Sequence, residues 1–204
     1  MLQVDNQTPF AASLSVFPDP EGVETAYAVV KAAFRLGEAE PVPIVPALPL
    51  LATDVFWGDP ATTSLRAAGE FALLKPATDV LLVGRAIAPR PGTRVAEVHL
   101  QVGPVQRTVR VFGDRHWRRS GGGWRASDPA EWDRMPLRWE LAFGGVGQPA
   151  SEGEPPEFEA RNPVGRGFLG RRQSPQEGQP LPNLEDPAHP ITDPHDRPPP
   201  CGLG

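Results

Sequence analysis

The part of the chain whose spacing most resembles a chemical motif is rich in glycine and arginine. Residues 165–170 read Gly-Arg-Gly-Phe-Leu-Gly and match the G-x-G-x-x-G pattern that binds the pyrophosphate of a dinucleotide. That chemistry requires a strand before the glycines and a helix after them. Asn162-Pro163 precedes the pattern and Pro175 follows it closely, and neither flank is typical of such a unit. The sequence therefore favours a structural loop, and we expect no cofactor.

Possible metal ligands are concentrated near the end of the sequence. They are His189, Asp193, His195 and Cys201. Their spacing fits no closed structural zinc pattern, and the many prolines among them predict a stiff, extended polar tail. The single cysteine excludes an intramolecular disulfide and is typical of a reducing compartment. We therefore expect a cytoplasmic protein without a bound metal.

Candidate catalytic side chains lack the context that hydrolysis requires. The chain has no G-x-S-x-G nucleophile elbow, and His116 with Asp114 makes a pair rather than a triad. Glu140, Glu185 and Asp186 are acids that a glycosidase could use, but a sequence does not give their separation. Charged residues beside glycine turns usually anchor loops. The sequence predicts a protein that is not an enzyme, with a carboxylate-dependent hydrolase or a carbohydrate-binding β domain as the alternative.

Charge is distributed in blocks. Residues 1–80 carry ten acids and four bases, residues 85–125 nine bases and two acids, and residues 126–204 thirteen acids and seven bases. The central basic block can pair with the acidic flanks of the same chain or with an acidic partner. The net charge of −5 argues against nucleic acid. No apolar run approaches the roughly 18 residues of a membrane helix, so we expect no membrane insertion.

Alternation of apolar and polar residues predicts a mainly β protein, an antiparallel sheet or sandwich-like domain with very little helix and long Pro/Gly-rich loops. The clearest element is a hairpin formed by residues 95–102 and 105–112 around Gly103-Pro104. A half-buried strand is predicted over residues 27–36, with Lys31 and Arg35 on its solvent face. The face expected to be buried consists of Ala28, Val30, Ala32, Phe34 and Leu36.

Other elements are predicted less directly. Trp117 and Trp124 flank a glycine turn and are expected to pair across a second hairpin. One helical turn is expected from Asp128 to Trp132, because an Asp N-cap followed by proline favours it. Further strands are predicted at residues 2–5, 10–17, 79–87 and 137–142, and an extended crossing at residues 37–50.

Composition changes near residue 150. Residues 1–150 have the composition of an ordinary globular chain and are predicted to form an antiparallel β domain. Residues 151–204 hold twelve of the 27 prolines and few apolar residues. We expect them to form a Pro/Gly-rich irregular segment that is packed on the domain or partly disordered.

Two stretches with unusual patterns stand out in the chain. Residues 136–145 read Pro-Leu-Arg-Trp-Glu-Leu-Ala-Phe-Gly-Gly, a strand pattern with Leu137, Trp139 and Leu141 on one face that stops at two glycines. Residues 161–168 read Arg-Asn-Pro-Val-Gly-Arg-Gly-Phe and have no periodicity. A strand that leads into glycine-rich loops predicts a rigid scaffold that presents a shaped surface.

Motifs in order along the chain resemble one protein family. They are Thr8-Pro-Phe10, Val29-Val-Lys31, Lys75-Pro76, Asp79-Val-Leu81, Gly113-Asp-Arg-His-Trp117, Met135-Pro136, Trp139-Glu-Leu-Ala-Phe-Gly-Gly145, Arg161-Asn-Pro-Val-Gly-Arg-Gly-Phe168 and Leu181-Pro-Asn-Leu-Glu185. The family is a domain-of-unknown-function family encoded in bacterial type VI secretion clusters, beside the spike protein VgrG and PAAR-tipped effectors. The resemblance implies a cytoplasmic, non-enzymatic adaptor that binds a secreted effector and helps to load it onto the VgrG/PAAR spike.

The motifs supply candidate residues that either bind the partner or organise the loops. They are Trp139, Glu140, Phe143, Gly144, Gly145, Arg161, Asn162, Gly165, Arg166, Gly167, Phe168, Asn183 and Glu185. We expect Arg161, Asn162 and Arg166 to hold the loop by hydrogen bonds to backbone carbonyls. Trp139 and Phe143 are expected to pack beneath it.

Overall fold

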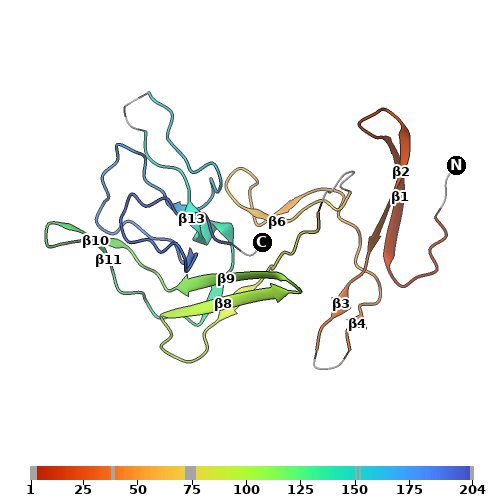
Figure 1. The fold of residues 1–204 in the computed structure, drawn as a ribbon, viewed down its shortest axis with the longest axis horizontal. Coiled ribbons are helices and arrows are strands. Elements are labelled where there is room, and N and C mark those ends of the chain that lie inside the picture. The colour runs from red at the N-terminus through yellow and green to blue at the C-terminus, as the bar shows by residue number, and fades with distance from the viewer. Residues whose placement is uncertain (1–3, 38–39, 72–76, 150, 152, 203–204) are drawn as a thin grey trace. The chain divides into compact units, whose positions relative to one another are not determined.

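The computed structural model describes residues 4–37, 40–71, 77–149, 151 and 153–202 (Figure 1). In this part of the chain the regular structure is fifteen short strands and one 3-10 helix of three residues, η1 (Trp139–Leu141). The strands form small sheets of two or three members, nearly all antiparallel. The predicted mainly β class with very little helix is confirmed.

Contacts divide the chain into two compact units. Unit 1 comprises residues 1–55 and 67–78, and unit 2 comprises residues 56–66 and 79–204. The Pro/Gly-rich segment 151–204 therefore belongs to unit 2. Whether residues 1–150 form a domain of their own stays a prediction.

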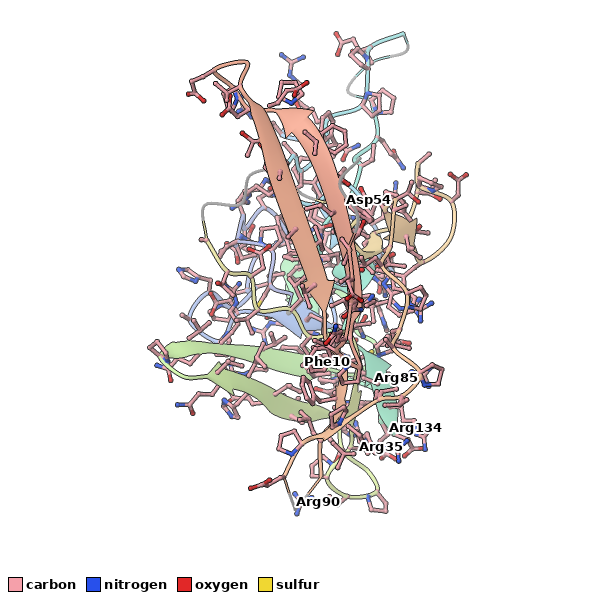
Figure 2. The ribbon with its side chains drawn as sticks, turned by 90° about the vertical axis from the view of Figure 1, so that its right-hand side faces the viewer. Phe10, Arg35, Asp54, Arg85, Arg90 and Arg134 are labelled. Carbon is pink, nitrogen blue, oxygen red and sulfur yellow. The ribbon has the colours of Figure 1, made fainter. Side chains whose placement is uncertain are left out.

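Unit 1 is built on a long hairpin. Strand β1 (Ala11–Pro18) pairs antiparallel with β2 (Glu24–Lys31) over eight residues each. Figure 2 shows the two strands side by side, with Phe10 at the end of the hairpin opposite the turn. In that turn Asp19 Oδ1 accepts hydrogen bonds from the backbone N–H of Glu21 and Val23. A shorter pair follows, β3 (Phe34–Arg35) with β4 (Val42–Pro43).

The predicted strand over residues 27–36 is wrong in two respects. It is interrupted after Lys31, and the side expected to be buried is the exposed one: Val30 is 63% and Leu36 80% exposed. Lys31 is instead partly covered, because its ammonium group donates hydrogen bonds to Pro49 O (3.0 Å) and Glu70 Oε2 (3.0 Å). Alternation identified the two faces but not the covered one.

Unit 2 contains the hydrophobic core. Strands β8 (Val95–Val102) and β9 (Val105–Phe112) pair over their whole length, which confirms the predicted hairpin. Strand β15 (Leu184–Glu185) adds antiparallel to β9 and places Leu184 opposite Val111. The core cluster of buried side chains consists of Ala86, Val109, Val111, Trp132, Met135, Leu137, Ala142, Leu184 and Cys201.

Smaller strand pairs surround this core. Strand β7 (Arg85–Ile87) pairs antiparallel with β12 (Arg134–Pro136), and Figure 2 labels Arg85 and Arg134 on these neighbouring strands. Strand β5 (Val55–Phe56) pairs with β6 (Leu65–Ala67), and the tip of that hairpin, residues 56–66, belongs to unit 2. Strands β13 (Phe143–Gly144) and β14 (Arg166–Gly167) form the one parallel pair among the strand pairs described here.

The predicted glycine-turn hairpin is present, but its tryptophans do not pair. Strand β10 (Trp117–Ser120) and β11 (Gly123–Ala126) place Trp117 opposite Ala126 and Trp124 opposite Arg119. The two-residue loop Gly121-Gly122 sets this register. Trp117 is buried, whereas Trp124 lies beneath the Arg119 guanidinium, whose carbon is 5.2 Å from the ring centroid.

Four further expectations differ from the structure. Of residues 137–142, Trp139–Leu141 form η1 and none is in a strand. Residues 128–132 form no helical turn, because the Ala130 and Trp132 N–H groups bond to Asp114 O and Thr93 O instead. Of residues 79–87 only Arg85–Ile87 are in a strand. The strand predicted at residues 2–5 lies partly outside the described residues, and Val4 and Asp5 are not in one.

Candidate functional site

The two glycine-rich motifs meet as a parallel pair. Strand β13 lies beside β14 with Phe143 opposite Arg166 and Gly144 opposite Gly167. Arg166 N donates to Ala142 O (3.0 Å), and Phe168 N donates to Gly144 O (3.0 Å). The segments predicted as separate loops are therefore joined through their backbones.

Asn162 holds this junction together. Its side chain is buried, and Nδ2 donates to both Trp139 O (2.9 Å) and Phe143 O (3.0 Å). Its own carbonyl oxygen accepts from Gly145 N (2.8 Å). One amide side chain thus fixes the start of η1 and the start of β13, and it uses both of its N–H donors to do so.

The glycines are required by close approach of the two segments. A Cβ on Gly144 would lie 2.1 Å from Asn162 O, and one on Gly165 would lie 2.4 Å from Asn162 Nδ2. A Cβ on Gly145 would lie 2.4 Å from Gly165 O, and one on Gly167 would lie 2.8 Å from the Cδ of Pro182. Gly144 also has a φ of +150° and Gly145 one of +97°, which other residues rarely adopt. A side chain at any of these four glycines would therefore prevent the close packing that the structure shows around them.

Arg166 connects the junction to the core sheet. Its Nε donates to Glu140 O (3.0 Å) and its Nη1 donates to Asn183 Oδ1 (3.1 Å). Asn183 Nδ2 in turn donates to Phe112 O (3.1 Å) and Asp114 Oδ1 (3.0 Å). Burial lowers the pKa of the Arg166 guanidinium, while the negative charges of Asp114 and Glu140 oppose this shift. The network is charged and largely hidden from water.

A buried ion pair lies beside this network. Arg115 and Glu185 are 7% and 4% exposed, and the guanidinium donates directly to the carboxylate. Arg115 Nη2 also donates to Pro182 O (2.7 Å), and its guanidinium carbon lies 3.6 Å from the Phe112 ring centroid. Glu185 Oε2 accepts from Ile191 N (3.2 Å). This carboxylate is occupied in holding loops together.

Glu140 anchors the tip of the β5–β6 hairpin. Its two carboxylate oxygens accept from Ser64 N (2.8 Å) and Ser64 Oγ (2.9 Å). Nearby, the Arg138 guanidinium carbon lies 3.6 Å from the Trp57 ring centroid, a cation–π contact. Trp139, half-buried, lies so close to Gly202 that a Cβ there would be 2.9 Å from the indole ring.

Arg161 differs from the other candidates because it is exposed. It forms a two-pronged ion pair with Glu159 (both 2.8 Å), and its Nη2 donates to Pro198 O (3.2 Å). The hydrogen bond from Arg161 is the main cause that lowers the pKa of Glu159. The candidates that are buried or half-buried are Trp139, Glu140, Phe143, Gly144, Gly145, Asn162, Gly165, Arg166, Gly167, Phe168, Asn183 and Glu185. Their positions organise the loops; contact with a partner stays a prediction.

A surface with exposed apolar side chains and charged groups of both signs lies on these organised loops. Val146 and Phe158 form an isolated antiparallel bridge and are 59% and 56% exposed. A depression beside them is lined by the Phe168 ring and by Arg171 and Arg197. We call Val146, Phe158, Phe168, Arg171 and Arg197 the loop surface.

The other chemistries considered from sequence find little support in the geometry. His189 pairs with Asp186 (3.1 Å), and Cys201 is buried in the core, where burial raises the pKa of its thiol. Within the described residues, no three His, Cys, Asp or Glu side chains are grouped as metal ligands would be. In the same residues, no helix has the length and apolar character needed to cross a membrane. Residues 171–179, after the G-x-G-x-x-G pattern, are irregular rather than helical.

Fold and site together define a mainly β protein in which a buried polar network fixes two glycine-rich segments. Residues 21–204 match the model of a family described as uncharacterized protein conserved in bacteria (DUF2169). Because the match covers most of the chain, the protein belongs to this bacterial family. No curated protein matches it, and no solved structure does.

Sequence reasoning missed several members of the network. Asp114 and Arg115 lie in the Gly113-Asp-Arg-His-Trp117 motif, which was recognised without a role being assigned to them. Ser64 carried no signal, because its segment shows no firm period and its partner Glu140 is far away in sequence. Phe158 lies in an acidic, proline-rich stretch and was not singled out as an exposed aromatic residue.

Proposed function

We propose that this protein is a non-enzymatic, cytoplasmic adaptor of a bacterial type VI secretion system. It binds a secreted effector, PAAR-containing or similar, and helps to load it onto the VgrG spike. Its motifs resemble those of proteins encoded beside VgrG and PAAR effectors, and its family is bacterial. Its net charge of −5 supports a protein partner over nucleic acid.

One observation carries this proposal: the motif residues are used to make a rigid platform. Asn162 and Arg166 bind backbone carbonyls, and the glycines let the two segments touch. The loop surface lies on this platform and exposes Val146 and Phe158. A binding surface fixed before association loses less entropy when the partner docks, and exposed aromatic residues are common binding hot spots.

The positions of the acidic residues argue against the hydrolase alternative. Glu140 accepts two hydrogen bonds from Ser64, and Glu185 is paired with Arg115. Asp186 accepts from Ala188 N, and its pKa is lowered chiefly by that bond. A general acid needs a raised pKa and access to substrate. These three carboxylates instead anchor loops, so we propose no catalytic role for them.

The test is co-expression with the effector and VgrG encoded beside the gene, followed by affinity capture through the adaptor. Wild-type protein should retain the effector, and Phe158→Ala should reduce its recovery at least tenfold. The matched control is Ile87→Ala, which removes an apolar side chain of unit 2 that is 72% exposed but lies outside the loop surface. Failure of the wild type to retain the effector would refute the proposal.

A second variant tests the platform itself. Arg166→Ala removes the donor to Glu140 O and Asn183 Oδ1, and should abolish effector capture or the fold of unit 2. Wild-type behaviour of this variant in both respects would contradict the assignment. Circular dichroism distinguishes loss of capture from loss of fold.

A further inference from the structure

The register of the β1–β2 hairpin gives it two faces of different character. On one face lie alternating polar and apolar residues, including Tyr27 and Lys31. The opposite face has six apolar side chains, which we call the hairpin face: Ala12, Leu14, Val16, Ala26, Ala28 and Val30. Such a face is usually buried against a core.

Unit 1 covers only the first of these faces. Lys31 Nζ bonds to Pro49 O and Glu70, and Glu70 Oε2 also accepts from Leu51 N (2.8 Å). The β2 residues on that face are half-buried, whereas Ala26, Ala28 and Val30 are exposed. On β1, Val16 is 44% exposed. Ala12 and Leu14 are half-buried, so the exposed part of the hairpin face is its β2 side together with Val16.

The edges of the hairpin are open as well. Within the described residues, β1 and β2 pair with each other and with no other strand. No described residue of unit 1 is buried, and an isolated two-stranded hairpin is marginally stable in water. Open edges beside an uncovered apolar face favour addition of an extended strand.

Charge indicates what kind of strand fits. Unit 1 carries eight acids and three bases, a net charge of −5, and Asp19, Glu21 and Glu24 lie at the turn end of the hairpin. A second copy of the chain would bring the same negative charge to the contact, which is unfavourable. A strand with basic residues beside its apolar ones would instead be attracted.

We propose that the hairpin face and the adjacent strand edge bind an extended segment of a partner protein in which apolar residues alternate with basic or polar ones. Backbone hydrogen bonds along the edge supply affinity, and the apolar side chains cover Val16 and Val30. The Asp19–Glu24 turn selects for positive charge. This site belongs to unit 1, whereas the loop surface belongs to unit 2.

The experiment uses the full chain and a fluorescent peptide of about nine residues, with valine alternating with lysine or threonine, a length that matches the hairpin. Fluorescence anisotropy should show binding that falls at least tenfold for Val30→Glu. The matched control Val102→Glu changes a strand valine of unit 2 that is 50% exposed, and should leave binding unchanged. Absence of binding to wild type, or equal loss in both variants, would overturn the proposal.

Two further measurements test separately how much charge and backbone hydrogen bonding contribute to peptide binding. Replacing the lysines of the peptide with glutamate should weaken binding at least tenfold, and Glu24→Lys, at the turn end of the hairpin face, should reverse much of that preference while leaving the six apolar side chains in place. Replacing alternate peptide residues with proline should abolish binding, because proline cannot donate along an edge. Equal binding of basic and acidic peptides would refute the charge argument.

Folding and self-association are controlled separately. The only tyrosine, Tyr27, lies in β2, so 3-fluorotyrosine gives one ¹⁹F resonance that reports whether the hairpin is intact in each variant. Val30→Thr keeps the β-branched shape and should still weaken binding. A wild-type dimer that Val30→Glu converts to monomers would overturn the proposal in favour of a second copy. Because no effector is present, failure here leaves the adaptor proposal standing.

Discussion

Two hairpins of equal strand length behave differently in this protein. Strands β8 and β9 are eight residues each and paired throughout, as are β1 and β2. In the β8–β9 hairpin Val109 and Val111 are 0% exposed, whereas Val30 in β2 is 63% exposed. The two hairpins share the same local pattern but differ in how they are covered: the β8–β9 hairpin contributes to the core, whereas one face of the β1–β2 hairpin is largely exposed.

The cover of β9 comes from distant parts of the chain. Leu184 pairs beside Val111, and Trp132, Met135 and Cys201 join the same cluster. On the other face of the β1–β2 hairpin, Lys31 contacts Glu70 and Pro49, and the β2 residues of that face are half-buried rather than buried. What the comparison teaches is that a strand face becomes core only when a third segment reaches it.

The largest expected effect comes from placing a charge on each hairpin. Val111→Asp buries an unpaired carboxylate and should cost more than about 4 kcal/mol, whereas Val30→Asp should cost less than about 0.5 kcal/mol. In urea unfolding, tryptophan fluorescence reports unit 2, where all five tryptophans lie, and the ¹⁹F signal of 3-fluorotyrosine at Tyr27 reports unit 1. Similar costs for the two substitutions would show that both hairpins are equally covered.

A pair of glycine substitutions comes next. Gly144→Ala places a Cβ 2.1 Å from Asn162 O and should destabilise unit 2 by about 3–5 kcal/mol. Gly22, in the β1–β2 turn, has a φ of +82° but nothing within 4 Å of an added Cβ. Gly22→Ala should therefore lower the free energy of unfolding by only about 1 kcal/mol, which is the cost of a positive φ for alanine without any steric clash. Thermal unfolding of both variants measures the difference, and equal costs would contradict close approach at Gly144.

Removal of the buried amide should have an intermediate effect. Asn162→Ala leaves Trp139 O and Phe143 O without this donor and should cost about 2–3 kcal/mol in unit 2. The matched control in unit 1 is Asn6→Ala, where an exposed side chain donates to Phe10 O and should cost less than about 1 kcal/mol. Denaturation with urea distinguishes these cases, and a neutral Asn162→Ala would show that the junction does not depend on this side chain.

The smallest effect is a pH dependence confined to unit 1. Burial raises the pKa of Glu70, but hydrogen bonds from Lys31 and Leu51 and the Lys31 charge lower it more, so it lies below its ordinary value of 4.5. Such a group stabilises the folded state above pH 4.5, and the contribution is lost as pH falls through the lowered folded pKa. The ¹⁹F signal at Tyr27 should show this acid destabilisation, and Glu70→Gln should remove it. An unchanged acid response in that variant would exclude Glu70 as the cause.

Sequence reasoning succeeded where the structure is local. The β8–β9 hairpin follows from alternation on either side of Gly103-Pro104, and the end of the strand pattern at Gly144-Gly145 marks two positions where the backbone has a positive φ. Both signals lie within a few residues of the element they determine. The mainly β class follows from the same alternation.

Sequence reasoning failed where the local structure depends on a contact with a residue far away in the sequence. Trp139 lies in a segment whose residues alternate as in a strand. Its carbonyl oxygen nevertheless accepts a hydrogen bond from the Asn162 side chain, and the segment forms the 3-10 helix η1. The parallel pairing of β13 with β14 has no strand pattern in either segment, because two-residue strands are too short for periodicity. Exposure of Val30 was missed for the same reason, since alternation does not say which face another segment covers.

The position of Cys201 in the core has a consequence for synthesis of the protein. Cys201 and Leu184 pack with Val109 and Val111, so residue 201 must have left the ribosome before that cluster can close. The β1–β2 hairpin, by contrast, is complete once residue 31 has emerged. A nascent chain therefore presents its N-terminal hairpin long before its core is sealed, and a waiting partner could engage it during translation.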